Sequence, residues 1–116
     1  MTGIQADFAV SDRLEGGVPI VVVRGEIDVA TAPQLRDRLR AMTETNPPLS
    51  VVDLSAVTFL DSTGLGVLVG AVTERRDAGA DLRLVVTEPH ITKVFSITGL
   101  DEVFSIYPDL DGALSR

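Results

Sequence analysis

Cysteine and tryptophan are absent from this 116-residue chain, and histidine occurs once. Without cysteine the chain cannot form a disulfide scaffold, a thiol nucleophile or a cysteine-ligated zinc site. The single histidine, His90, would have to build a metal site or a catalytic triad with carboxylates alone, and no residue near it has ligand spacing. We therefore expect no metal centre, and we interpret His90 as a polar loop residue after Pro89.

Long hydrophobic runs are also missing from the sequence. No segment approaches the roughly 18 consecutive apolar residues that a membrane helix needs. Residues 1–10 lack the basic start and the apolar stretch of a secretory signal peptide. We therefore expect a cytoplasmic protein that makes no contact with a membrane.

Basic residues are few relative to acidic ones. Ten Lys and Arg stand against 17 Asp and Glu, which gives a net charge of −7 and a pI near 4.5. Such a charge repels nucleic acids and anionic membranes and favours a partner with a basic surface. Arginines do gather at 36–40 and 75–76, but acidic residues interleave with them, so we interpret both segments as solvated helix faces.

The apolar residues suffice for one folded domain. Hydrophobic residues make up 45% of the chain and the mean hydropathy is +0.27, so we expect residues 1–116 to form a single domain around one core. Segments rich in β-branched residues predict strands at 6–11, 18–24, 50–54, 82–86 and 103–107. A glycine turn at 15–17 joins the first two strands into a hairpin.

Helical patterns separate the later strands. Apolar residues at helical spacing predict four helices: from Thr31 to the prolines at 47–48, from the segment 61–64 to Gly79, at 92–98 before Gly99, and at 108–115. The alternation of strands and helices predicts an α/β fold. In it, about four helices pack against a mixed, mostly parallel sheet of about five strands.

The segment from Phe59 to Gly66 carries acidic, hydroxyl and glycine residues at the start of a predicted helix. Asp61, Ser62 or Thr63 would serve as an N-cap that accepts a bond from a free backbone N–H. Alternatively, an exposed hydroxyl there is a phosphorylation site, because the positive end of a helix stabilises a phosphate. The residues alone leave both interpretations open.

The glycines that follow suggest a nucleotide-binding protein, but their spacing does not match the known motifs. The segment 64–70 differs by one position from the dinucleotide-binding G-x-G-x-x-G, and the chain has no P-loop. We interpret Gly66 and Gly70 instead as positions that let the helix pack close to the sheet.

The motif Asp-Ser-Thr-Gly-Leu-Gly at 61–66 resembles the phosphorylation loop of the STAS family of anti-sigma factor antagonists. A second segment, Gly-Glu-Ile-Asp at 25–28, resembles the turn into that family's first helix, and the similarity extends over almost the whole chain. The resemblance implies a single STAS domain with a STAS-like sandwich fold. It assigns phosphorylation to Ser62, with Thr63 as the second choice, and implies partner contacts by Asp28, Asp61, Ser62, Thr63 and Gly64.

The resemblance also implies a partner. That partner is an anti-sigma factor that is itself a serine kinase with the histidine-kinase-like ATPase fold. The unphosphorylated protein binds it and frees the sigma factor, phosphorylation at Ser62 ends the binding, and a serine phosphatase restores the first state. No catalytic activity, cofactor or metal is implied. The alternative is a STAS subunit of a stress-signalling complex or a lipid-transport system without sigma-factor control.

Overall fold

A five-stranded sheet forms the centre of the structure, a computed structural model that describes residues 8–115. The strands are β1 Ala9–Glu15, β2 Val18–Ile27, β3 Leu49–Leu60, β4 Asp81–Val85 and β5 Ser105–Tyr107. They lie in the order β1-β2-β3-β4-β5, with β1 antiparallel to β2 and every later pair parallel. The predicted mixed, mostly parallel sheet is confirmed. Residues 6 and 7 of the first predicted strand lie outside the described residues.

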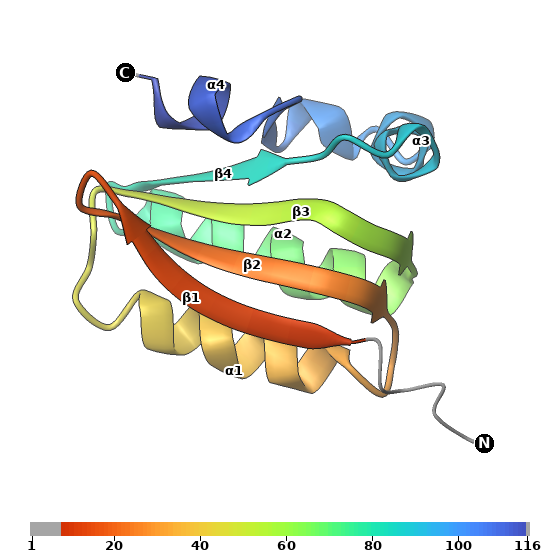
Figure 1. Cartoon of the computed structure of the whole chain (residues 1–116), viewed down its shortest axis with the longest axis horizontal. Helices are drawn as coiled ribbons and strands as arrows, with labels where there is room; N and C mark the ends of the chain where they lie inside the picture. The colour runs from red at the N-terminus through yellow and green to blue at the C-terminus, as the bar shows by residue number, and fades with distance from the viewer. Residues whose placement is uncertain (1–7, 116) are drawn as a thin grey trace.

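Within residues 8–115, four α-helices accompany the sheet, as predicted. They are α1 Ala32–Met42, α2 Ser62–Asp77, α3 Pro89–Ile97 and α4 Leu110–Leu114, and a 3₁₀ turn, η2, covers Leu100–Glu102. Helices α1 and α2 lie side by side along one face of the sheet, and α4 lies against the opposite face (Figure 1). Because each strand–helix–strand crossover has the same hand, α1 and α2 fall on the same face.

Side chains of β2 alternate between two hydrophobic clusters. Val21 and Val23 point into the larger cluster beneath α1 and α2. Val18 and Ile20 belong to a smaller cluster on the other face, where Ala113 of α4 covers them. This period-2 pattern is what places helices on both faces of the sheet.

The β1–β2 hairpin turns through Gly16 and Gly17. Both glycines have positive φ values, 57° and 83°, which a two-residue hairpin turn requires and which side chains disfavour. Glu15 pairs with Val18 directly across the turn. The glycine turn predicted from the sequence is confirmed.

Strand β3 is much longer than the predicted segment 50–54. Only its first part, 49–53, pairs with β4, and its second part pairs with β2 alone. Register shifts between Val22 and Arg24 and between Gly25 and Glu26 interrupt the β2–β3 ladder. Bulges of this kind break the alternation of buried and exposed residues, so the sequence pattern ended before the strand did.

Helix α3 begins three residues earlier than predicted. Pro89 occupies its first turn, where proline is favoured because it has no N–H to satisfy. Ile91 and Phe95 are buried one turn apart, which makes the earlier start part of the core. The helix ends as predicted, since Gly99 follows it with a φ of 77°.

The prediction that Gly66 and Gly70 bring α2 close to the sheet is wrong. A Cβ atom at either position would meet nothing within 4 Å. The close approach occurs at Gly64, where a Cβ atom would lie 2.6 Å from Ile27 Cγ2 and 2.6 Å from Leu60 Cδ1. The start of α2 therefore packs against the last residues of β2 and β3.

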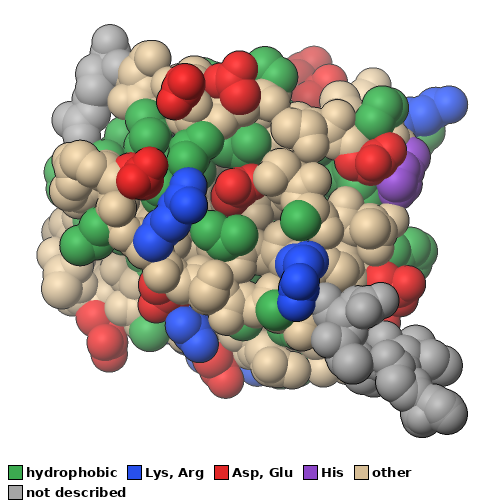
Figure 2. Space-filling model, in the orientation of Figure 1, with side chains coloured by type: hydrophobic (Ala, Val, Ile, Leu, Met, Phe, Trp, Pro, Cys, Tyr) green, Lys and Arg blue, Asp and Glu red, His purple; other side chains and the backbone are tan. Residues whose placement is uncertain are grey.

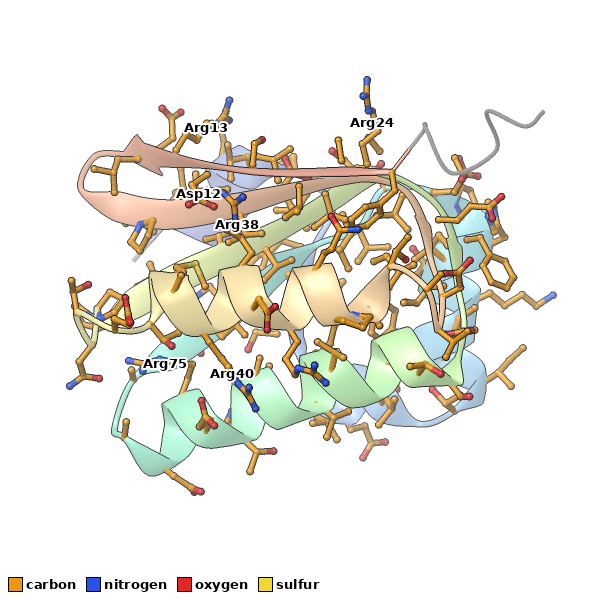
Figure 3. All side chains as sticks on the ribbon, turned by 90° about the horizontal axis from the view of Figure 1, so that it is seen from below. Asp12, Arg13, Arg24, Arg38, Arg40 and Arg75 are labelled. Carbon is orange, nitrogen blue, oxygen red and sulfur yellow. The ribbon has the colours of Figure 1, made fainter. Side chains whose placement is uncertain are left out.

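The interpretation of residues 75–76 as a solvated helix face is wrong for Arg75, which is 5% exposed. Its Nη2 atom donates to Asn46 Oδ1 at 2.6 Å and to the Pro47 carbonyl at 3.0 Å. Figure 3 shows the side chain pointing to the loop after α1. Arg75 continues the buried stripe of Leu68 and Val72 at helical spacing, so it joins α2 to that loop.

Candidate functional site

Asp28 and Asp61 lie at neighbouring strand ends. Ile27 and Leu60 are register partners in the parallel β2–β3 pair, and each aspartate directly follows one of them. The Asp61 N–H donates to the Ile27 carbonyl at 3.2 Å, which joins the two loops. The carboxyl edge of a parallel sheet is where α/β proteins place their binding residues. The two predicted aspartates are thus brought together with Ser62, the next residue after Asp61.

Asp61 is the N-cap of α2. Its backbone is extended, with φ −101° and ψ −176°, and its Oδ1 accepts a hydrogen bond from the Gly64 N–H at 3.1 Å. Of the three candidate N-caps Asp61, Ser62 and Thr63, the capping residue in the structure is Asp61. Ser62 and Thr63 are exposed, whereas Gly64 is buried. The Ser62 hydroxyl therefore lies at the surface without a capping role.

Asp28 organises the loop between β2 and α1. Its Oδ1 accepts from the Ala30 N–H at 2.9 Å and from the Thr31 N–H at 3.1 Å. The Thr31 hydroxyl donates to the Glu26 carbonyl at 2.8 Å and accepts from the Asp28 N–H at 2.9 Å. This loop is consequently held in one conformation, with the carboxylate of Asp28 half-buried at its centre.

Ser62 is the first residue of a 16-residue helix. The free N–H groups of the first turn give a helix N-terminus a partial positive charge, and no acidic side chain lies within the first turn of α2. A phosphate on Ser62 would be stabilised by that end of the helix. It would also lie next to the N-cap carboxylate of Asp61. A phosphate on Ser62 would therefore lie at the positive end of the helix and beside a carboxylate.

Two exposed apolar side chains at this edge escaped the sequence prediction. Val29, next to Asp28, is 73% exposed, and Phe59, two residues before Asp61, is 47% exposed. Large apolar side chains beside charged groups are typical of protein interfaces. Neither stands out in the sequence, because Val29 directly precedes Ala30, and Phe59 directly precedes Leu60 in a strand whose bulged register hides which side chains face solvent.

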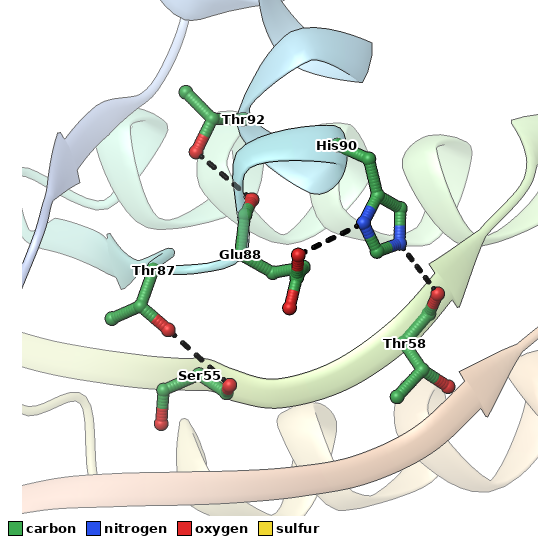
Figure 4. Close-up of polar contacts among 6 residues, drawn as sticks. All are labelled: Ser55, Thr58, Thr87, Glu88, His90 and Thr92. Carbon is green, nitrogen blue, oxygen red and sulfur yellow. Dashed lines mark hydrogen bonds and ion pairs between the residues drawn. The ribbon is translucent and has the colours of Figure 1, made fainter.

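His90 joins α3 to the end of β3 (Figure 4). It lies in the first turn of α3 and not in a loop, so the sequence interpretation of its position is wrong. Nε2 is 2.7 Å from the Thr58 carbonyl and Nδ1 is 3.1 Å from Glu88 Oε1. The Thr87 hydroxyl also donates to the Ser55 carbonyl at 3.3 Å. These hydrogen bonds engage the Ser55 and Thr58 carbonyls, which lie in the part of β3 that does not pair with β4. Thr58 is three residues before Asp61.

We expect His90 to make folding more stable at acid pH. Both partners of its ring are acceptors, so the Thr58 carbonyl and the Glu88 carboxylate raise the pKa of His90 above 6.5. The stabilisation of the folded state by His90 is fully present below its unfolded-state pKa and is lost as the pH rises through its higher folded-state pKa. Urea unfolding should show a larger deficit of His90→Gln against wild type at about pH 5.5 than at about pH 8.5. An equal deficit at both pH values would contradict this.

Side chains of both charge signs occur on the surface. Figure 2 shows acidic and basic side chains interspersed on the face that it presents, with the histidine at one edge beside acidic groups. Among residues 8–115, no three His, Asp or Glu side chains gather closely enough to hold a metal ion. Within that same part of the chain, no helix combines the length and the apolar character needed to cross a bilayer.

Comparison with known proteins identifies similar chains. The family model described as "STAS domain" matches residues 9–113. An anti-sigma-B factor antagonist of Bacillus subtilis is 36% identical over 94 residues, which are 81% of this chain and 85% of that protein. An anti-sigma-F factor antagonist of Mycobacterium tuberculosis is 33% identical over 99 residues, 85% of this chain and 80% of that one.

A solved structure agrees with the fold. The crystal structure of an anti-sigma factor antagonist from Mycobacterium paratuberculosis matches with a TM-score of 0.85 and 38% sequence identity. The match covers 92% of this chain and 91% of that one. The likeness therefore extends over nearly the whole chain.

Proposed function

The chain belongs to the STAS domain family, and on that premise we propose that it is an anti-sigma factor antagonist whose binding is controlled by phosphorylation of Ser62. The observation that carries the proposal is that capping of α2 and exposure of a hydroxyl fall on two different residues. Asp61 caps the helix, and this leaves the exposed Ser62 hydroxyl available to a kinase. The names of the similar proteins support the assignment as an anti-sigma factor antagonist.

In the unphosphorylated state, the edge formed by Asp28, Asp61 and Ser62 binds the anti-sigma factor and frees the sigma factor. Val29 and Phe59 supply apolar area on this edge. The carboxylates of Asp28 and Asp61 favour a basic surface on the partner and speed the encounter. The protein acts by binding and has no catalytic step of its own, and its place of action is the cytoplasm.

Phosphorylation of Ser62 ends the binding. A phosphoserine carries a charge of about −1.5 to −2 at neutral pH. At this edge it stands beside the carboxylate of Asp61, so a partner surface matched to two aspartates would face about twice the negative charge. The bulky, hydrated phosphate would also have to lose water in the interface. We propose that the anti-sigma factor is itself the serine kinase, of the histidine-kinase-like ATPase fold, and that a serine phosphatase reverses the modification.

We expect Asp28→Asn and Asp61→Asn each to weaken binding of the anti-sigma factor by about tenfold, because each removes one charge that faces a basic partner. Both variants should melt like wild type, since asparagine accepts the same hydrogen bonds and caps a helix about as well as aspartate. Isothermal titration with the purified anti-sigma factor measures the affinity.

The matched control is Asp77→Asn, which removes the same charge at the last residue of α2, the opposite end from Ser62. It should bind like wild type. If all three variants bind equally well, the strand-end edge is not the interface. If no anti-sigma factor binds even the wild-type protein, the chain serves another assembly.

A further inference from the structure

A cavity of about 330 Å³ opens between α1 and α2, away from the sheet. Its apolar lining comes from Leu39 of α1 and from Val67 and Ala71 of α2. Gly66 and Gly70 also line it, and a Cβ atom at either would meet nothing within 4 Å. The volume is at the lower end of the range of about 300–1,000 Å³ that small-molecule sites occupy.

Two arginines stand at the rim of this cavity. Arg36 and Arg40 lie one turn apart on α1 and both line the opening. Figure 3 shows Arg40 reaching from α1 toward α2. Within residues 8–115 neither guanidinium has an ion-pair partner, whereas Arg38, between them, pairs with Asp12 at 3.2 Å on the side of β1. Glu74 is the one carboxylate among the lining residues.

The rim is therefore positive on a molecule whose net charge is −7. Arginine forms paired hydrogen bonds to carboxylate and phosphate groups and loses little hydration on doing so. Apolar side chains below it favour a hydrocarbon. A ligand that satisfies both has an anionic head and an apolar body of small volume.

We propose that the cavity between α1 and α2 binds a small anionic amphiphile, an acyl or alkyl chain that ends in a carboxylate or a phosphate. The head lies against Arg36 and Arg40, and the chain lies over Gly66 and Gly70. Thr63 lines the same cavity, so an occupant would extend to the residue after Ser62. Ligand binding in this cavity is independent of the proposed control of a sigma factor, so a negative result for one leaves the other untouched.

The probes are decanoate and decyl phosphate, each kept below its micelle concentration, with decanol and acetate as the uncharged chain and the chainless anion. In ¹⁵N-edited NMR spectra, both anionic probes should shift the amide signals of Gly66 and Gly70, and should bind at least about tenfold more tightly than decanol or acetate. The tighter of the two anionic probes then shows whether the site prefers a carboxylate head, as in a fatty acid, or a phosphate head. If decanol binds as well as both anions, or if neither anion shifts these amides, the proposal is wrong.

Variants separate the cavity from general surface binding. Gly70→Leu should fold, because the space at Gly70 is open, and should abolish binding by filling the cavity. Arg36→Gln and Arg40→Gln should each weaken binding by about tenfold. Arg76→Gln is the matched control, since this exposed arginine of α2 does not line the cavity, and it should bind like wild type. Binding that survives Gly70→Leu, or that falls equally with Arg76→Gln, would overturn the proposal.

Discussion

A Ser62→Asp variant should fold normally and bind the anti-sigma factor about 30-fold or more weakly than wild type. The new carboxylate would stand beside Asp61 at the strand-end edge, and a like charge in an interface costs several kcal/mol, each 1.4 kcal/mol being about tenfold in affinity. Ser62→Ala should retain binding, because it adds neither charge nor bulk. It should also resist the kinase.

The stability of the two variants gives the control. Because Asp61 already caps α2, neither substitution removes a cap, and thermal melts of both should lie close to wild type. Aspartate at the first helical position should be stabilised slightly by the helix dipole. The affinities should therefore rank alanine far above aspartate while the melting temperatures do not. If a folded Ser62→Asp protein binds the anti-sigma factor with wild-type affinity, Ser62 does not belong to the interface.

Gly64→Val should produce the largest loss of stability that we predict, about 3 kcal/mol. A Cβ atom at Gly64 would lie 2.6 Å from Ile27 Cγ2 and 3.3 Å from Ile27 Cβ. Ile27 is fully buried and branched at Cβ, so it cannot rotate away, and α2 would have to move off the sheet. For a domain of this size the melting temperature should fall by about 10 °C or more.

Gly66→Val is the matched control for that substitution. It makes the same chemical change one half-turn further along α2, where the space is open. Valine also has a slightly higher helix propensity than glycine, so the melting temperature should stay the same or rise a little. Equal losses of stability in the two variants would show that the effect does not come from the contact of Gly64 with Ile27.

The fold was predictable where local pattern and packing agree. The double-glycine turn, the strand at 82–86 and the end of α3 at Gly99 all follow from short-range chemistry. The mixed, mostly parallel sheet follows from the alternation of strands and helices along the chain. Prediction from the sequence failed where long-range packing determines the length of a strand or the burial of a side chain. A bulged ladder carries β3 to Leu60, and a buried arginine continues an apolar helix stripe, and neither has a distinct local signal.

The candidate site divides in the same way. The resemblance pointed to Asp28, Asp61 and Ser62, and register pairing of Ile27 with Leu60 explains why they meet. Sequence alone could not choose the N-cap of α2, because aspartate, serine and threonine all cap well. It also assigned the close packing of α2 to the wrong glycines, since spacing shows which residues share a helix face but not which face meets the sheet.

The most direct measurement starts from a complex of the anti-sigma factor with its sigma factor and adds this protein in two forms. One form is unphosphorylated, and the other has been phosphorylated to completion by the kinase, with the modified residue mapped by mass spectrometry. We expect phosphate on Ser62 and not on Thr63. We also expect the unphosphorylated form to release the sigma factor and the phosphorylated form not to release it. Release by both forms, or a phosphate on Thr63 as the main product, would contradict the proposed function.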